Sequence, residues 1–209
     1  KLSEVNIKSN FINGLRVTDK DTINIVEDVL IKFNKEIVEA LNELGCKAKK
    51  ITSEKNNIIT VIQENKGLGF VGTPTKINKE LLTETIKANE VPVVAPLGLN
   101  KDNQTFNINA DTAAGSIAIE LKARRLMIIS DVEGVLDSEK KLIPEINSKK
   151  ANELIDKEVI SGGMIPKIKN CLDVASNGVK AVVIIDGRKN HSLLFELLSD
   201  KGSGTLIRE

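Results

Sequence analysis

A short polar run, Asn107-Ile108-Asn109-Ala110-Asp111, holds the residue types in this sequence that most directly suggest chemistry. We expect the run to end a strand and to open a helix of small residues, with Asn107 and Asn109 pointing to one side of the strand end. Asp111 would lie in the first helical turn. Two amides and a carboxylate at a helix N-terminus suggest a place for an anionic ligand and for lysine side chains. A capped helix after an ordinary strand is the simpler interpretation, and the run alone favours it.

A second stretch with chemical potential is Ser161-Gly162-Gly163-Met164-Ile165-Pro166-Lys167. Two glycines at an expected helix start let the backbone approach a phosphate closely. Lys167, in the first turn, would supply a point charge to a transferring phosphoryl group. A flexible linker with a solvated lysine explains the stretch equally well.

Three further candidates come from the ends of expected elements. Ser130-Asp131-Val132-Glu133-Gly134 could offer backbone amides and an acid to a nucleotide, although a plain turn is the commoner meaning of such a run. Asp186-Gly187-Arg188 follows a second apolar strand. Arg16 carries a guanidinium fork that suits a carboxylate, although most arginines lie at the surface. Nothing in the sequence pairs His191, the single histidine, with a nucleophile, so serine–histidine and zinc chemistry are not indicated.

The elements that must position these residues alternate between helix and strand. Apolar residues spaced three and four apart predict a long helix over 19–44, with Thr18 or Asp19 as its N-cap and Gly45 ending it. Residues 48–52 and 58–63 are expected to form a β-hairpin around the turn Ser53-Glu54-Lys55-Asn56-Asn57. Further helices are expected at 79–88, 148–156, 164–176 and 191–198, and strands at 91–98, 126–131, 181–186 and 205–207.

This alternation predicts an α/β fold with an open, mainly parallel sheet sandwiched by helices, and a small β-hairpin near 47–78. In such sheets ligands bind beyond the carboxyl ends of the strands, where the candidate residues fall.

The bulk composition is that of an ordinary globular protein. The chain has 209 residues, 41% of them hydrophobic and 28% charged, and its net charge of +1 favours neither nucleic acid nor a membrane surface as partner. No apolar run approaches the length that spans a membrane. Cys46 and Cys171 show neither metal-ligand nor redox spacing, which indicates a reducing, cytoplasmic compartment.

Five motifs occur in a fixed order along the chain: 14–19, 107–111, 130–136, 161–167 and 186–188. Together they closely resemble the amino-acid kinase family and, within it, the kinases that act on N-acetyl-L-glutamate. The resemblance covers essentially all 209 residues. Each motif is modest alone, but the ordered set is highly specific.

The resemblance implies ATP-dependent phosphorylation of the side-chain carboxylate of N-acetyl-L-glutamate to N-acetyl-L-glutamyl 5-phosphate, the second step of arginine biosynthesis. By this resemblance Arg16 would hold the substrate's carboxylate, and Asn107 and Asn109 would assist. Lys167 would stabilise charge on the transferring phosphoryl group, and Asp111 would orient the catalytic lysines. Phosphoryl transfer needs mainly in-line positioning and positive charge, and a carboxylate nucleophile needs no general base.

The same resemblance implies ATP with Mg²⁺ bound mainly through the phosphates. The residues that would lie at the nucleotide are Ser130, Asp131, Gly134, Gly163 and Met164. Arginine-sensitive members of the family resemble this chain at Glu196 and Gly202, which favours feedback inhibition by L-arginine. These members carry a histidine where this chain has Val183. Because the long helix forms the dimer interface in the family, a homodimer or a hexamer (a trimer of dimers) is implied.

The chain also departs from the family pattern. The family begins with a strand bearing a lysine and glycines and then a second glycine-rich loop, whereas this chain opens at Lys1 without methionine. We therefore expect one amino-acid kinase domain, 1–209, that lacks its N-terminal portion and is inactive or very weak by itself. Residues 1–90 would be the remainder of the acetylglutamate-binding and dimerisation half, and 91–209 the nucleotide-binding half. The turn at 53–56 departs from the family's usual Gly-Lys-Asp-Gly.

Two alternative functions remain compatible with the sequence. One is a sister amino-acid kinase that acts on another carboxylate or phosphate substrate. The other is a non-catalytic remnant that binds arginine.

Overall fold

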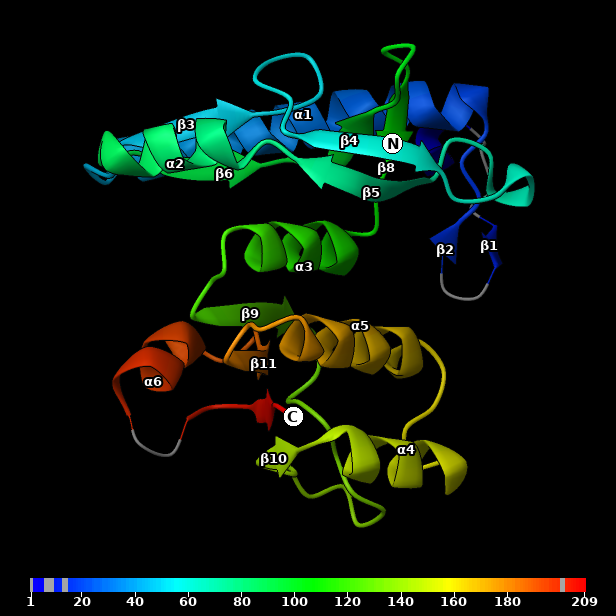
Figure 1. The fold of residues 1–209 in the computed structure, drawn as a ribbon, viewed down its shortest axis with the longest axis vertical. Coiled ribbons are helices and arrows are strands. Elements are labelled where there is room, and N and C mark those ends of the chain that lie inside the picture. The colour runs from blue at the N-terminus through cyan, green and yellow to red at the C-terminus, as the bar shows by residue number, and fades with distance from the viewer. Residues whose placement is uncertain (1, 6–9, 13–14, 200–201) are drawn as a thin grey trace. The chain divides into compact units, whose positions relative to one another are not determined.

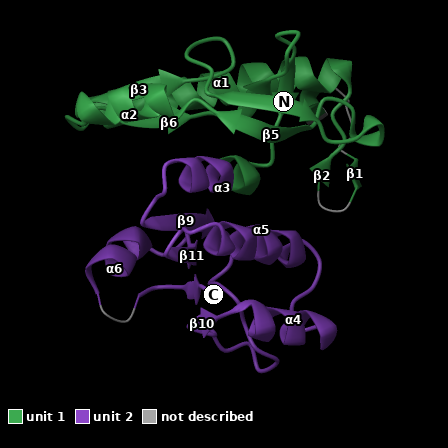
Figure 2. Cartoon of the chain, viewed as in Figure 1, with its two compact units in different colours: residues 1–113 green, residues 114–209 purple. Residues whose placement is uncertain are grey.

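The computed structural model describes residues 2–5, 10–12, 15–199 and 202–209. The chain divides into two compact units, Lys1–Ala113 (unit 1) and Ala114–Glu209 (unit 2), shown in Figure 2. The boundary falls inside a helix rather than in a linker. The functional halves 1–90 and 91–209 differ from these compact units and remain a prediction.

Unit 1 combines short strands with two helices (Figure 1). Its elements are a 3₁₀ turn (Leu2–Val5), β1 (Phe11–Ile12), β2 (Leu15–Arg16), α1 (Lys20–Glu43), β3 (Ala48–Ile51), β4 (Ile59–Gln63), a 3₁₀ turn (Lys66–Leu68), β5 (Gly72–Ile77), α2 (Lys79–Lys87), β6 (Val91–Val94), β7 (Leu97–Leu99) and β8 (Thr105–Asn107). The helix α3 (Ala110–Glu120) begins in unit 1 and ends in unit 2.

The long helix α1 confirms the expected helix over 19–44. Asp19 is its N-cap, and the carboxylate accepts a hydrogen bond of 2.8 Å from the backbone N–H of Thr22. Hydrogen bonding from Thr22 lowers the pKa of Asp19 below its ordinary value. At the other end Gly45 has φ +82°, the left-handed conformation that terminates helices. The apolar face buries Ile23, but Phe33 is 57% exposed.

The strand pairing of unit 1 differs from the sequence expectation at one point. The predicted hairpin between 48–52 and 58–63 is wrong, because β3 pairs in parallel with β6 and β4 pairs in antiparallel fashion with β5. The intervening turn makes its own hydrogen bonds, including Thr52 N–H to the Lys55 carbonyl at 2.9 Å. The hairpin expected near 47–78 is therefore present, but as β4–β5.

A second difference concerns residues 91–98, which were expected to form one strand. The structure breaks them at Ala95-Pro96 into β6 and β7, which pair in different sheets. Proline has no N–H to donate to a ladder, so the chain changes sheet where the ladder must stop. The four-stranded sheet of unit 1 has the order β5-β4-β7-β8, and β3-β6 and β1-β2 form two-stranded sheets.

Unit 2 contains one sheet of order β10-β12-β11-β9 with helices beside it. Its elements are β9 (Arg125–Ser130), β10 (Glu145–Ile146), α4 (Ser148–Asp156), α5 (Met164–Ser176), β11 (Ala181–Asp186), α6 (Ser192–Leu198) and β12 (Thr205–Ile207). The helices α4 and α5 have the bounds that the sequence predicted. The parallel pairs β9–β11, β10–β12, β3–β6 and β4–β7, together with the helices, confirm the α/β prediction.

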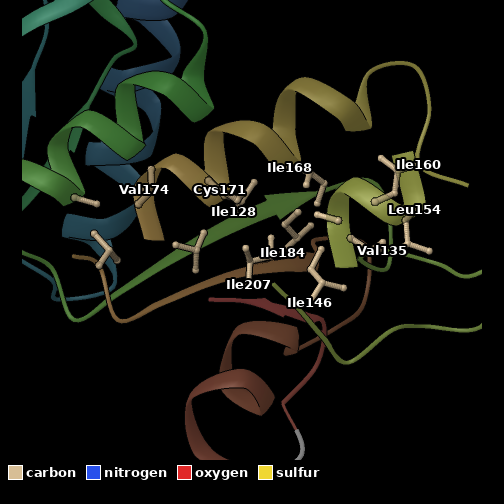
Figure 3. Packing of buried hydrophobic residues seen from close by; sticks show 14 residues of the cluster. Ile128, Val135, Ile146, Leu154, Ile160, Ile168, Cys171, Val174, Ile184 and Ile207 are labelled. Carbon is tan, nitrogen blue, oxygen red and sulfur yellow. The ribbon is translucent and has the colours of Figure 1, made fainter. Parts of the chain in front are cut away.

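A single apolar cluster holds unit 2 together (Figure 3). Its central side chains, such as Ile168, Ile184 and Ile207, are fully buried between α5 and the sheet. Gly115 of α3 packs closely on α5, because a Cβ there would lie 2.7 Å from Val174 Cγ2. No helix among the described residues is long and apolar enough to cross a membrane.

Candidate functional site

Three of the predicted substrate residues line one small pocket in unit 1. The pocket has a volume of about 170 Å³, and we call it the amide pocket after its two asparagines. It is lined by Phe11, Leu15, Arg16, Val71, Asn107 and Asn109. A guanidinium and two side-chain amides on one pocket wall can hold a carboxylate and a neighbouring amide group of a ligand.

The segment 68–71 brings Arg16 and Asn107 together although they lie far apart in the sequence. It hydrogen-bonds with residues just after Arg16, since Thr18 N–H donates to the Leu68 carbonyl at 2.9 Å. It also binds the strand that carries Asn107, whose N–H donates to the Phe70 carbonyl at 2.9 Å. The segment is thus a bridge between the two halves of the pocket.

The bridge depends on Gly69. This residue has φ +69°, and a Cβ there would lie 2.3 Å from the Thr18 carbonyl oxygen. No L side chain can occupy this position without moving the backbone, which explains why a glycine stands here.

The guanidinium of Arg16 is oriented by Phe11, whose ring centroid lies 4.7 Å from the Arg16 Cζ. A cation over an aromatic face is attracted by the ring's quadrupole, so β1 helps to place the charge. Arg16 is half-buried. Gly14, the first residue of this motif, lies outside the described residues.

Asn109 and Asp111 flank the start of α3. The side-chain oxygen of Asn109 accepts a hydrogen bond of 3.1 Å from the backbone N–H of Thr112, so Asn109 caps the helix. Asn109 also lines the amide pocket. Asp111 lies in the first turn, as predicted, and is half-buried. Asn107 is half-buried at the end of β8.

The predicted nucleotide residues Ser130 and Asp131 follow β9 in unit 2. Ser130 is the register partner of Asp186 on β11, and the Gly187 N–H donates to the Ser130 carbonyl at 2.8 Å. The carboxyl ends of the two strands therefore meet, where parallel sheets place their ligands. We call Ser130, Asp131, Glu133, Asp186, Arg188 and Lys189 the strand-end cluster.

Two carboxylates of the strand-end cluster, Asp186 and Glu133, are paired with cations. Arg188 contacts the buried Asp186 with two parallel hydrogen bonds, Nε to Oδ1 at 2.9 Å and Nη2 to Oδ2 at 3.0 Å. The Arg188 side chain and backbone N–H lower the pKa of Asp186 to about 2. Lys189 Nζ lies 3.3 Å from Glu133 Oε2. Sequence reasoning marked the motif at 186–188 but did not assign these ion pairs.

Gly134, another predicted nucleotide residue, is buried and has φ +139°. A Cβ at this position would lie 2.6 Å from Thr205 Oγ1. Thr205 in turn accepts a hydrogen bond from the Val135 N–H at 2.8 Å and donates one to the Ile143 carbonyl. The glycine is thus required by packing, and its contact with a nucleotide stays a prediction.

Gly163, Met164 and Lys167 lie at the start of α5, as predicted. The helix begins at Met164, and a Cβ on Gly162 or Gly163 would meet no heavy atom within 4 Å. This turn is therefore open to a ligand that approaches the backbone. Lys167 is half-buried in the first turn of the helix.

The two predicted arginine-site residues, Glu196 and Gly202, lie side by side. A Cβ on Gly202 would be 2.9 Å from Glu196 Oε2, and that oxygen accepts a hydrogen bond of 2.9 Å from the Ser203 N–H. Arg125 was not predicted here, yet its Nη1 lies 3.5 Å from Glu196 Oε1 and donates to the Glu196 carbonyl. Glu196 is thus a buried carboxylate that contacts a guanidinium from β9.

Comparisons with known proteins agree on one family. The family model that matches is described as the amino acid kinase family, and it covers residues 1–186. That match spans both units.

Curated relatives are similar over the whole chain. An acetylglutamate kinase from Pelagibacter ubique (strain HTCC1062) is 92% identical over 209 residues, which are 100% of this chain and 73% of the relative. An acetylglutamate kinase from Rhodospirillum centenum is 45% identical over 99% of this chain and 72% of the relative.

Solved structures share the fold. The crystal structure of smu.665 from Streptococcus mutans UA159 matches with a TM-score of 0.86 and 31% identity, over 99% of this chain and 80% of that one. An N-acetylglutamate synthase from Neisseria gonorrhoeae, complexed with coenzyme A and N-acetyl-glutamate, matches 99% of this chain and 48% of that one. Its TM-score is 0.88 at 22% identity, which shows the fold alone.

Proposed function

This chain belongs to the amino acid kinase family, and on that premise we propose how its residues carry out the phosphorylation of N-acetylglutamate. The activity is transfer of a phosphoryl group from ATP to N-acetylglutamate in arginine biosynthesis, the activity for which relatives at 92% and 45% identity are named. The observation that carries the assignment of residues is the amide pocket, which Arg16, Asn107 and Asn109 line together.

Arg16 binds a carboxylate of N-acetylglutamate in the amide pocket. A guanidinium makes two parallel hydrogen bonds with a carboxylate, and the Phe11 ring limits the directions in which this guanidinium can point. Asn107 and Asn109 supply amide groups that can pair with the polar groups of the substrate. Because Asn109 Oδ1 already caps α3, its N–H groups are the ones that face the substrate.

The transfer step needs positioned charge rather than a base. An oxygen of the substrate's side-chain carboxylate forms a bond to the γ-phosphorus of ATP, and the bond from that phosphorus to the β–γ bridging oxygen breaks, so that ADP leaves with the electron pair. No proton moves. Lys167 stabilises the negative charge on the transferring group, and Asp111 orients lysine side chains around it.

The nucleotide binds at the carboxyl ends of β9 and β11, near Ser130, Asp131 and Gly134, and at the open turn formed by Gly163 and Met164. Mg²⁺ would accompany ATP, bound mainly through the phosphates, and would supply positive charge that offsets theirs. No group of three acidic, histidine or cysteine residues suited to a metal occurs in the described part of the chain.

L-Arginine inhibits the enzyme by binding at Glu196 and Gly202. The contact of Glu196 with the Arg125 guanidinium supports this assignment, because it establishes that this carboxylate accepts a guanidinium in the fold. Free arginine would compete with Arg125 for the same oxygens. Replacement of Arg125 by methionine is therefore expected to tighten arginine binding.

The protein assembles as a homodimer, or as a hexamer made of three dimers, through α1. Exposed apolar side chains on this helix, Val29 and Phe33, support an interface there. Cys46 and Cys171 are not joined in a disulfide, which suits a cytoplasmic location.

Titration calorimetry with N-acetylglutamate tests the central assignment. We expect the chain to bind the ligand, Arg16→Ala to abolish measurable binding, and Arg16→Lys to weaken it strongly, since lysine keeps the charge but loses the fork. Arg124→Ala, which removes an exposed arginine of unit 2, is the control and should bind normally. Unchanged affinity in Arg16→Ala would refute the role of the amide pocket.

A further inference from the structure

The strand-end cluster contains more negative charge than a nucleotide site should tolerate. Asp131, Glu133 and Asp186 all lie at the ends of β9 and β11, next to the proposed position of an anionic ligand. Asp186 is buried, with 3% of its side chain exposed. Hydrogen bonds from Arg188 hold its pKa near 2, so that it is ionised at every physiological pH.

Two cations compensate two of these carboxylates. Arg188 covers Asp186 through two parallel hydrogen bonds and a third from its own backbone N–H, at 2.9 Å. Lys189 covers Glu133 from the next position in the chain. The pKa of Arg188 is raised chiefly by Asp186 and further by Asp131 and Glu133, so all three carboxylates lie within the field of this guanidinium.

Of the three carboxylates, Asp131 is the one that pairs with neither Arg188 nor Lys189. A lone carboxylate can accept hydrogen bonds from the hydroxyl groups of a ribose, whereas three uncompensated carboxylates would repel the phosphates that follow it. Asp131 can therefore accept hydrogen bonds from a ribose, while the charges of Asp186 and Glu133 are offset by Arg188 and Lys189 and repel the phosphates less.

We propose that Arg188 is a positioning residue that neutralises Asp186 and so allows the triphosphate of ATP to approach the strand-end cluster. This inference rests on the proposed nucleotide site at Ser130 and Asp131. Arg188 acts through the carboxylate that it covers, since two of its nitrogens are used for Asp186. The Arg188 side chain is 63% exposed, so dissolved salt screens the effect of its charge on a nearby phosphate.

The test is calorimetric titration of Arg188→Ala with ATP, ADP and adenosine at low ionic strength. Removal of the guanidinium leaves an ionised carboxylate at the site, so we expect ATP affinity to fall about tenfold, ADP affinity about threefold, and adenosine affinity to stay unchanged. A guanidinium that only holds the turn would weaken all three ligands equally. Equal weakening, or no weakening of ATP, would overturn the proposal.

The double variant Asp186→Asn/Arg188→Ala removes the charge together with its partner. We expect it to recover most of the ATP affinity lost in Arg188→Ala, and failure to recover would also overturn the proposal. The matched control is Arg208→Ala, because Arg208 makes the same kind of two-bond pair with Glu145, at 2.6 and 2.7 Å, between β12 and β10. This control should leave ATP affinity unchanged.

Asp131→Asn separates this inference from the proposed nucleotide site. If Asp131→Asn weakens ATP binding but Arg188→Ala does not, the site stands and the role of Arg188 falls. If the unaltered chain binds no ATP, the proposed nucleotide site and this inference fall together.

Discussion

The amide pocket of unit 1 and the strand-end cluster of unit 2 are built in opposite ways. The amide pocket has one cation, Arg16, among neutral amides, and its residues come from distant segments that a backbone bridge joins. The strand-end cluster has five charged side chains, and its pairs are neighbours in sequence or on adjacent strands. In the pocket a single side chain carries recognition, whereas in the cluster the balance of charges matters more than any single group.

The largest effect is expected where the bridge of the amide pocket is broken. Gly69→Ala places a Cβ 2.3 Å from the Thr18 carbonyl and forces an alanine into φ +69°. We expect a loss of about 3 kcal/mol in the free energy of unfolding, together with loss of N-acetylglutamate binding. Chemical denaturation measures the free energy of unfolding, and titration calorimetry measures N-acetylglutamate binding.

Gly45→Ala is the control for this change. It imposes a similar backbone strain at φ +82°, but its Cβ would meet nothing within 4 Å. It should cost about 1 kcal/mol and leave ligand binding intact. Equal effects of the two variants would mean that the bridge to Thr18 has no special importance.

The next largest effect concerns Gly134, which follows Glu133 of the strand-end cluster in the sequence. Gly134→Ala brings a Cβ 2.6 Å from Thr205 Oγ1 and should lower the free energy of unfolding by about 2 kcal/mol, with weaker ATP binding as a consequence. Gly178→Ala, at φ +97° in open space, is the matched control and should leave ATP binding unchanged. Normal ATP binding by a folded Gly134→Ala variant would contradict the predicted link between this turn and the nucleotide.

A smaller effect is expected from the support behind the amide pocket. Glu27 Oε1 on α1 accepts hydrogen bonds from Ser53 Oγ at 2.6 Å and from Thr105 Oγ1 at 2.8 Å, and Thr105 precedes Asn107 on β8. Thr105→Val should cost about 1 kcal/mol of stability and weaken N-acetylglutamate binding a few-fold. Thr75→Val, at an exposed threonine on β5, is the control. If Thr105→Val lowers stability but leaves N-acetylglutamate binding unchanged, the hydrogen bond to Glu27 supports the fold alone and not the pocket.

The smallest effect is a pH dependence of the strand-end cluster. The folded-state pKa of Asp186 is lowered from 3.8 to about 2, so its ion pair stabilises the fold above pH 4 and this stabilisation is lost as the pH falls towards 2. The melting temperatures of the unaltered chain and Asp186→Asn should therefore differ most above pH 4 and converge near pH 2. A constant difference across this range would contradict a pKa of about 2 for Asp186.

Local signals predicted the helices well. The cap residues Asp19 and Gly45 predicted the two ends of α1, and α4 and α5 have the bounds that were expected at 148–156 and 164–176. These signals act within a few residues, so they survive in any tertiary context.

Strand partners were not predictable in the same way. β3 lies next to β4 in the sequence but pairs with β6, because the ladder is decided by packing between distant segments. The ion pair of Arg125 with Glu196 joins residues equally remote from each other. The resemblance to a known family named Arg16, Asn107 and Asn109 as one group, and these residues line one pocket, although their contact with a substrate stays a prediction. The bridge through Gly69 depends on the tertiary structure and had no local signal in the sequence.

The place of β12 in the sheet has a consequence for synthesis on the ribosome. This strand lies between β10 and β11, and its Thr205 and Ile207 are fully buried. All the strands that the structure describes in unit 1 have been synthesised once residue 113 has emerged. Unit 2 must keep a gap in its sheet until residues 205–207 appear, so a nascent chain stalled before them would expose apolar edges to chaperones.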